Sequence, residues 1–209
     1  MKAYMWVYMY IVLVHIVVAI SALVFFYVPL YVSALFMFLS LVTFFYLWRR
    51  EYEKIYLLHS ANNILLCASA GVVFVKLVPD VSFVFGFVLA VVFIDIVSFT
   101  GWGKHLPNRK MAENVPLAKR LSASLPIPGI AEVYQITGMG DMFLSSVVVA
   151  SAVKFFPAVA WIGVLSVVLG QTLNIFLVHV MRKRKNYVGV PAAPAVVFLY
   201  IFLLLIFHS

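Results

Sequence analysis

Two aspartates, Asp95 and Asp141, lie inside otherwise apolar stretches of a chain that is 66% hydrophobic. The other carboxylates lie in predicted connections or at the edge of a stretch (Glu51, Glu53, Asp80, Glu113 and Glu132). A charged side chain at membrane depth costs at least ~2.5 kcal/mol, so it is rare unless it is paired or functional. Two acids cannot form a salt bridge with each other, but they can share a proton. A carboxylate pair that shares a proton is the apparatus of aspartic proteolysis.

The composition predicts what surrounds these acids. Only 11% of the 209 residues are charged, which indicates an all-α polytopic membrane protein, a single transmembrane domain over residues 1–209. The lone Cys67 excludes an internal disulfide. Runs near the ~20 apolar residues that cross a bilayer predict seven spans. They are Met5–Leu30, Tyr31–Trp48, Ile55–Leu77, Val81–Thr100, Ala131–Ala152, Phe155–Met181 and Tyr187–Phe207.

Charge placement orients these spans. If the N-terminus is cytoplasmic, all of the 15 lysines and arginines except Lys76 and Lys154 fall on the cytoplasmic side. This asymmetry predicts a cytoplasmic N-terminus and an outside C-terminus, in the cell membrane. The run Arg182–Lys185 is then a topology anchor, and the net charge of +8 needs no nucleic-acid partner. The connection 101–130 is predicted to be a cytoplasmic loop, whose Asn108–Leu121 portion is either solvated or lies on the membrane surface.

The orientation places the two acids in the same leaflet. At ~1.5 Å per helical residue, Asp95 lies about 8 Å from the cytoplasmic end of its span and Asp141 about 15 Å from that of the next. The segment Pro191–Pro194 lies about 9–14 Å beyond Lys185 by the same rise. These depths are compatible with two facing carboxylates and a third element beside them.

Each motif has a local physical meaning. Gly138 and Gly140 lack Cβ atoms and are predicted to let another backbone or helix come close to Asp141. Pro191 and Pro194 are predicted to interrupt the last helix and free backbone carbonyls. Such carbonyls are tolerated at membrane depth only where protein or a water-filled cavity meets them.

These elements resemble, in type and order, the motifs of the presenilin and signal peptide peptidase family of GxGD intramembrane aspartyl proteases. They are Asp95 within Phe93–Ser98, then Gly138-Met139-Gly140-Asp141, then Pro191-Ala192-Ala193-Pro194. The resemblance covers about Val81 to Phe207, and the small size is similar to the archaeal-type homologues. Ile94 stands where the family usually has tyrosine, and Ala193 where its PAL motif has leucine.

The resemblance implies a presenilin-like catalytic bundle with core helices at about 81–100, 131–152 and 187–207. It implies an aspartic endopeptidase that hydrolyses peptide bonds within transmembrane segments of membrane proteins or signal-peptide remnants. Asp95 and Asp141 would be catalytic. The substrate-binding residues would be Gly138, Met139, Gly140, Pro191, Ala192, Ala193 and Pro194. The expected partners are transmembrane-helix substrates and the lipid bilayer; no metal site or cofactor is expected, and nothing indicates a homo-oligomer.

Other functions remain open on the sequence. A proton- or cation-coupled transporter would also use buried aspartates, although paired broken helices in two repeats would be expected and no repeat is evident. An inactive homologue acting as a membrane chaperone, and a prepilin-peptidase-like enzyme, are further alternatives. The polar residues His15, Asn62, Asn63, Gln171 and Asn174 are predicted to form interhelical hydrogen bonds. Ser145 is predicted to bond either the Asp141 carboxylate or its own i−4 carbonyl.

Overall fold

The computed structural model describes residues 2–100, 102–106, 109–110, 114–128, 133–181 and 191–208. Within these residues the chain is mostly helical, with eight α-helices, two short 3-10 helices and one two-stranded antiparallel sheet. The prediction of an all-α protein is therefore wrong in one respect, since it misses the sheet. The predicted anchor Arg182–Lys185 lies outside the described residues.

Five helices are long and apolar enough to cross a membrane, which supports a multi-pass membrane protein. They are α1 (Lys2–Tyr27), α2 (Leu30–Trp48), α3 (Tyr52–Leu77), α4 (Val81–Ser98) and α8 (Trp161–Met181). Pro29 separates α1 from α2 as predicted. Helix α8 begins later than predicted, after the short 3-10 helix η2 (Pro157–Val159).

The other two predicted spans, Ala131–Ala152 and Tyr187–Phe207, are wrong at their N-terminal ends. Residues Val133–Gly138 form strand β2, and helix α7 (Met139–Phe155) starts only afterwards. Helix α9 is also short and begins at Ala193, ending at Phe207. The depth of Asp141 counted along a helix from Ala131 therefore does not apply, because part of that path is extended chain.

Helix α7 is the centre of the bundle, and almost all of its residues from Met142 to Val153 are buried. Small residues let its neighbours approach closely, as is common between membrane helices. A Cβ added to Gly71 of α3 would stand 2.8 Å from the Cβ of Ser146. One added to Gly163 of α8 would stand 2.7 Å from that of Ala152. Because serines and alanines fill these contacts, α7 is buried by protein and does not need the apolar surface of a lipid-facing helix.

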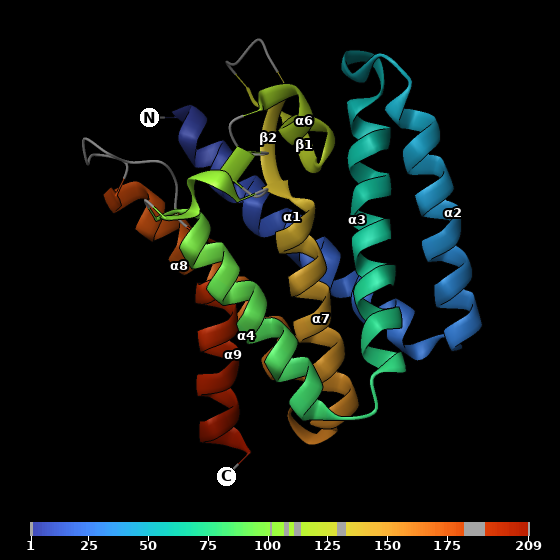
Figure 1. Cartoon of the computed structure of the whole chain (residues 1–209), viewed down its shortest axis with the longest axis vertical. Helices are drawn as coiled ribbons and strands as arrows, with labels where there is room; N and C mark the ends of the chain where they lie inside the picture. The colour runs from blue at the N-terminus through green and yellow to red at the C-terminus, as the bar shows by residue number, and fades with distance from the viewer. Residues whose placement is uncertain are drawn as a thin grey trace.

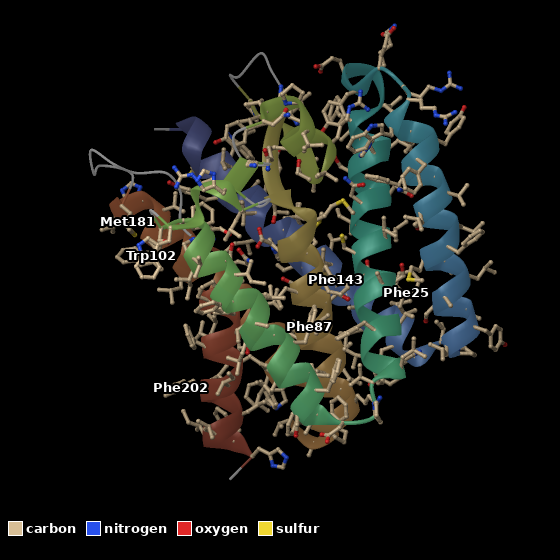
Figure 2. The ribbon with its side chains drawn as sticks, viewed as in Figure 1. Phe25, Phe87, Trp102, Phe143, Met181 and Phe202 are labelled. Carbon is tan, nitrogen blue, oxygen red and sulfur yellow. The ribbon has the colours of Figure 1, made fainter. Side chains whose placement is uncertain are left out.

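Figure 1 shows the arrangement around this centre, with α2 at the edge of the bundle against α3 and α4 crossing in front of α7 and α9. Helix α1 starts at one end of the molecule and α9 finishes at the other. Aromatic side chains fill the space between α4 and α7, where Figure 2 shows Phe87 and Phe143 near the middle of the bundle, with ring centroids 6.2 Å apart. Phe202 points outward from α9 and is 58% exposed.

The predicted cytoplasmic loop 101–130 is largely folded where it is described. It contains the 3-10 helix η1 (Trp102–His105), helix α6 (Val115–Arg120) and strand β1 (Ser122–Pro126). The first three residues of β1 are buried, so the C-terminal part of this connection is not a solvated loop. Beneath the sheet, Ile127 and Ile136 join a small apolar cluster with residues of α1 and Met142.

Strands β1 and β2 (Val133–Gly138) pair antiparallel, with an irregularity at Ala123 and Ser124. Ala123 pairs with Thr137 whereas Ser124 pairs with Gln135, so Ile136 is the extra residue of a bulge. The bulge explains why Ile136 and Thr137 are both buried although successive strand residues normally face opposite sides.

Polar side chains of α3 fix this hairpin to the bundle. Ser60 Oγ donates to the carbonyl of Ser124 (3.0 Å) and accepts from the N–H of the same residue (2.9 Å). Asn63 Nδ2 donates to the carbonyls of Arg120 (3.0 Å) and Ser122 (2.9 Å). Asn63 therefore holds the α6–β1 segment, and its bond to Arg120 joins α3 to helix α6, as the predicted interhelical bond requires.

Asn62 also confirms the prediction of an interhelical bond. Its Nδ2 donates to the carbonyl of Ser40 on α2 at 3.0 Å. This bond is buried, and it joins α3 to the outermost helix of the bundle.

The two lysines that the charge asymmetry leaves on the opposite side cap helix ends. Lys76 Nζ donates to carbonyls at the end of α1 (Phe25 and Val28), and Lys154 Nζ to carbonyls at the end of α3 (Val75, Lys76 and Val78). The last carbonyls of a helix lack intrahelical partners and carry partial negative charge, so an ammonium group there is stabilising. The positions of both lysines thus have a structural cause that is independent of topology.

Candidate active site

Asp141 lies in the first turn of α7, at the junction between strand and helix. Gly138 is the N-cap residue of α7, which makes Asp141 its third helical residue. The half-buried carboxylate interacts with the backbone of Gly138, the return contact that an acid at this position makes in a capping box. The start of a helix favours negative charge, so the fold offers Asp141 a stabilising environment of its own.

Asp95 lies near the C-terminal end of α4 and is half-buried. Its Oδ2 accepts a hydrogen bond from the backbone N–H of Ala193 at 3.2 Å, and the backbone of Ala192 also interacts with this carboxylate. Ala192 is the N-cap residue of α9. The first N–H groups of a helix have no intrahelical acceptor, so Asp95 caps α9 from a different helix.

The structure brings the two acids together. Asp95 and Asp141 are close enough for their charges to interact, although 46 positions separate them in the sequence. Each carboxylate lies at the N-terminus of a helix, Asp141 on α7 and Asp95 at α9. The meeting point of α4, α7 and α9 is therefore a site with two carboxylates, each held by backbone groups at the start of a helix.

The residues before Asp141 form its wall. An added Cβ at Gly138 would be 3.8 Å from Asp141 Oδ2, and one at Gly140 would meet nothing within 4 Å. No other described backbone or helix lies against these glycines, and the space beside Gly140 is open, so the predicted close approach stays a prediction. Met139 is held by its backbone: its N–H donates to the carbonyl of Leu121 (2.9 Å) and its carbonyl accepts from Cys67 Sγ (3.4 Å).

The segment Pro191–Pro194 precedes and begins α9. Pro194 lies in the first turn of the helix, where its missing N–H costs nothing. The prolines therefore lie at the beginning of the described helix, which starts at Ala193, and not within it. Pro191 and Pro194 instead border an apolar groove of about 600 Å³ that also includes Ile96 of α4.

A larger cavity of about 740 Å³ opens on Asp141 and Ala192. All six residues of β2 line it, together with residues of α1, α6 and α8. From α8 the side chains of Gln171 and Asn174 face it. Asp95 does not line this cavity, so access from it reaches one acid directly and the other only past Ala192 and Ala193.

Three polar predictions near the site turn out differently. Ser145 Oγ is buried and has no hydrogen-bond partner in the described part of the chain, so neither predicted bond forms. His15 bonds the carbonyl of Ile11 in its own helix (2.8 Å) and Thr137 Oγ1 of β2 (3.5 Å). The side chains of Gln171 and Asn174 form no interhelical hydrogen bond with any described residue, and Asn174 Oδ1 is a buried atom without a partner.

Sequence reasoning missed strand β2, which forms one wall of the site. A signal was available, because Val133-Tyr134-Gln135-Ile136-Thr137 is rich in β-branched and aromatic residues. The prolines before it, Pro126 and Pro128, favour a turn. Among the described residues, no group of three His, Cys, Asp or Glu side chains could hold a metal ion.

Comparisons with protein families, with curated proteins and with solved structures found no match to this chain.

Proposed function

We propose that this chain is an intramembrane aspartyl protease of the GxGD type, similar to presenilin and signal peptide peptidase. The observation that carries the proposal is the meeting of Asp95, Asp141 and the start of α9 at one point. The three sequence elements behind the resemblance lie far apart in the chain, and a chance similarity would give no reason for them to converge.

The chemistry follows from two carboxyl groups whose charges interact. A water between Asp95 and Asp141 gives a proton to the ionised carboxylate and attacks the scissile carbonyl carbon, while the protonated carboxyl donates to the carbonyl oxygen. The resulting gem-diol collapses as the C–N bond breaks, and a proton passes from an aspartate to the leaving amine. The backbone bond from Ala193 to Oδ2 holds the Asp95 carboxylate in place at the start of α9.

Strand β2 supports a peptide substrate in extended form. It pairs with β1 on one side only, and its other edge has no strand partner among the described residues. An extended peptide can pair with such an edge through its main chain. Since β2 runs directly into Asp141 (Figure 1), a strand paired there would carry its backbone toward the acids.

The proposal also includes the side of the membrane on which cleavage takes place. Four basic residues lie at the end of the bundle that holds the hairpin, where Arg120 bonds the carbonyls of Trp48 and Arg50: Arg49, Arg50, Lys119 and Arg120. By the positive-inside rule this end is cytoplasmic, which places the acids in the cytoplasmic half of the membrane.

A cleavage assay tests the proposal, using purified protein in detergent and a single-span reporter. The wild type should cut within the apolar segment of the reporter, and Asp95→Asn and Asp141→Asn should each be silent. Asp80→Asn is the matched control, because Asp80 is an exposed acid that only caps the far end of α4. Cleavage retained in either site variant would end the proposal. Aspartate-dependent proton flux into liposomes without cleavage would replace it with a proton-coupled transporter.

A further inference from the structure

Two amide side chains of α8 face the cavity and have no structural role in the described residues. Gln171 is only 2% exposed, and Asn174 Oδ1 is a buried acceptor without a partner. Neither side chain forms a hydrogen bond with a described residue. Buried polar groups are nearly always paired, so the Asn174 acceptor that lacks a partner among the described residues, with the buried Gln171 beside it, needs an explanation.

The positions of Gln171 and Asn174 restrict the role that these two side chains can have. Gln171, Asn174 and Val178 are spaced to share one face of α8, and all three line the cavity that Asp141 and Ala192 also line. The facing wall is β2, with its unpaired edge. At about 740 Å³ the cavity is within the usual range for ligand pockets, about 300–1,000 Å³.

In an extended peptide beside β2, only half of the backbone N–H and C=O groups can form hydrogen bonds with β2. Residues along a strand direct their N–H and C=O groups to alternate edges, so every second residue turns away from β2. In a site shielded from water these groups need partners. A carboxamide offers both a donor and an acceptor, which matches the N–H and C=O that one strand residue presents on the same edge.

We infer that Gln171 and Asn174 form a main-chain binding subsite that holds the second edge of the extended substrate opposite β2. This inference rests on the proposed function for the identity of the substrate. The subsite binds backbone and not side chains, so it fixes where a peptide lies without requiring a particular sequence. It also fixes the strand from both sides next to Asp141, where the scissile bond must be presented.

The test uses peptide binding, which does not depend on cleavage. A fluorescent single-span peptide is bound in detergent micelles to protein carrying Asp95→Asn and Asp141→Asn, and affinity is measured by anisotropy. Asn174→Leu and Gln171→Met remove the amides at similar size and should each weaken binding about tenfold. Thr172→Val is the control, since Thr172 is exposed and bonds only the Val168 carbonyl of its own helix.

A scan of backbone esters in the peptide gives the specific readout. Each ester replaces one backbone N–H donor, so it should lower the affinity of the peptide where that N–H is bonded. Along the bound segment one set of N–H groups faces β2 and the other, alternating with it, faces α8. In Asn174→Leu the second set should lose its sensitivity while the first keeps it. An unchanged alternation in this variant, or no alternation in the unsubstituted background, would overturn the subsite.

Two further measurements separate the explanations. Asn174→Leu should not lower the thermal midpoint, because the amide oxygen it removes has no partner among the described residues; a clear drop would mean a structural role and overturn the subsite. The proposed function fails separately if the native chain never cuts a reporter, even where the ester scan behaves as expected. The subsite fails separately if the native chain cuts normally and Asn174→Leu leaves its KM unchanged.

Discussion

Removing the Ser60 hydroxyl should loosen the wall of the site without touching the acids. Ser60 Oγ makes two hydrogen bonds to one residue, donating to the carbonyl of Ser124 and accepting from its N–H. Both residues are buried, at 3% and 0% exposed. The bulge in the sheet lies at Ser124, so its backbone turns toward α3 for these bonds.

The size of the effect follows from the groups left without a partner. Ser60→Ala leaves one buried N–H and one buried C=O without a partner, and each such group costs about 1–3 kcal/mol. After local relaxation the free energy of unfolding should fall by about 2–4 kcal/mol. Ser69→Ala is the matched control: Ser69 is a fully buried serine of the same helix, but its hydroxyl bonds only carbonyls of α3 itself. Its loss should cost about 0.5–1.5 kcal/mol.

Two measurements follow this perturbation. Equilibrium unfolding in mixed SDS micelles gives the free energies, and hydrogen exchange with mass spectrometry reports on the β1–β2 hairpin. Ser60→Ala should speed exchange over 122–126 and 133–138 and lower reporter cleavage, while Ser69→Ala leaves both near wild type. Equal unfolding free energies and equal exchange in the two variants would refute the role of Ser60 as the anchor of the hairpin.

Three substitutions elsewhere test the packing around the site. Lys154→Met removes three bonds to the last carbonyls of α3 and should lower the free energy of unfolding by about 1–3 kcal/mol, whereas Lys154→Arg should retain most of it in the same SDS titration. Gly170→Ala places a Cβ 2.5 Å from the backbone of Val196, so it should separate α8 from α9 and lower the free energy of unfolding by about 1–3 kcal/mol. Gly86→Ala is the control, because a Cβ there meets nothing within 4 Å and should be neutral or stabilising. Equal thermal midpoints for the two variants would contradict the contact between α8 and α9. Gly140→Ala also meets open space and should leave the thermal midpoint unchanged, yet slow reporter cleavage, because that space is proposed to hold substrate.

Hydropathy was enough to locate the first four long helices. Helices α1 to α4 follow the predicted spans closely, because a helix that crosses a membrane is largely apolar along its length. The same criterion failed at α7, which is wrapped by protein and carries Ser145, Ser146 and Ser151 in its buried interior. Hydropathy also extended that span backward over β2, since Val133, Tyr134 and Ile136 are apolar in any secondary structure.

Only part of the candidate site could be predicted from the sequence. Asp95 and Asp141 stood out because charge is costly in an apolar stretch, and the structure does place them together. The cavity wall did not stand out, because Gln171 and Asn174 are ordinary helix residues until the strand opposite them is known. That strand depends on Ser60 and Asn63, contacts across about 60 positions that no local pattern encodes.

The helix termini decide which of the two acids needs a functional explanation. Asp141 caps its own helix, so a structural role alone would account for an acid at this position. No such capping role on its own helix explains Asp95, because it lies near the C-terminal end of α4, where the partial charge of the helix is negative. It is stabilised by the backbone of Ala193 and Ala192, at the start of a helix almost a hundred positions away. Asp95→Asn is therefore the more informative variant: its amide oxygen can still accept from Ala193 and keep α9 in place, while the proton chemistry is lost. A folded Asp95→Asn protein that still cleaves would leave both acids as helix caps.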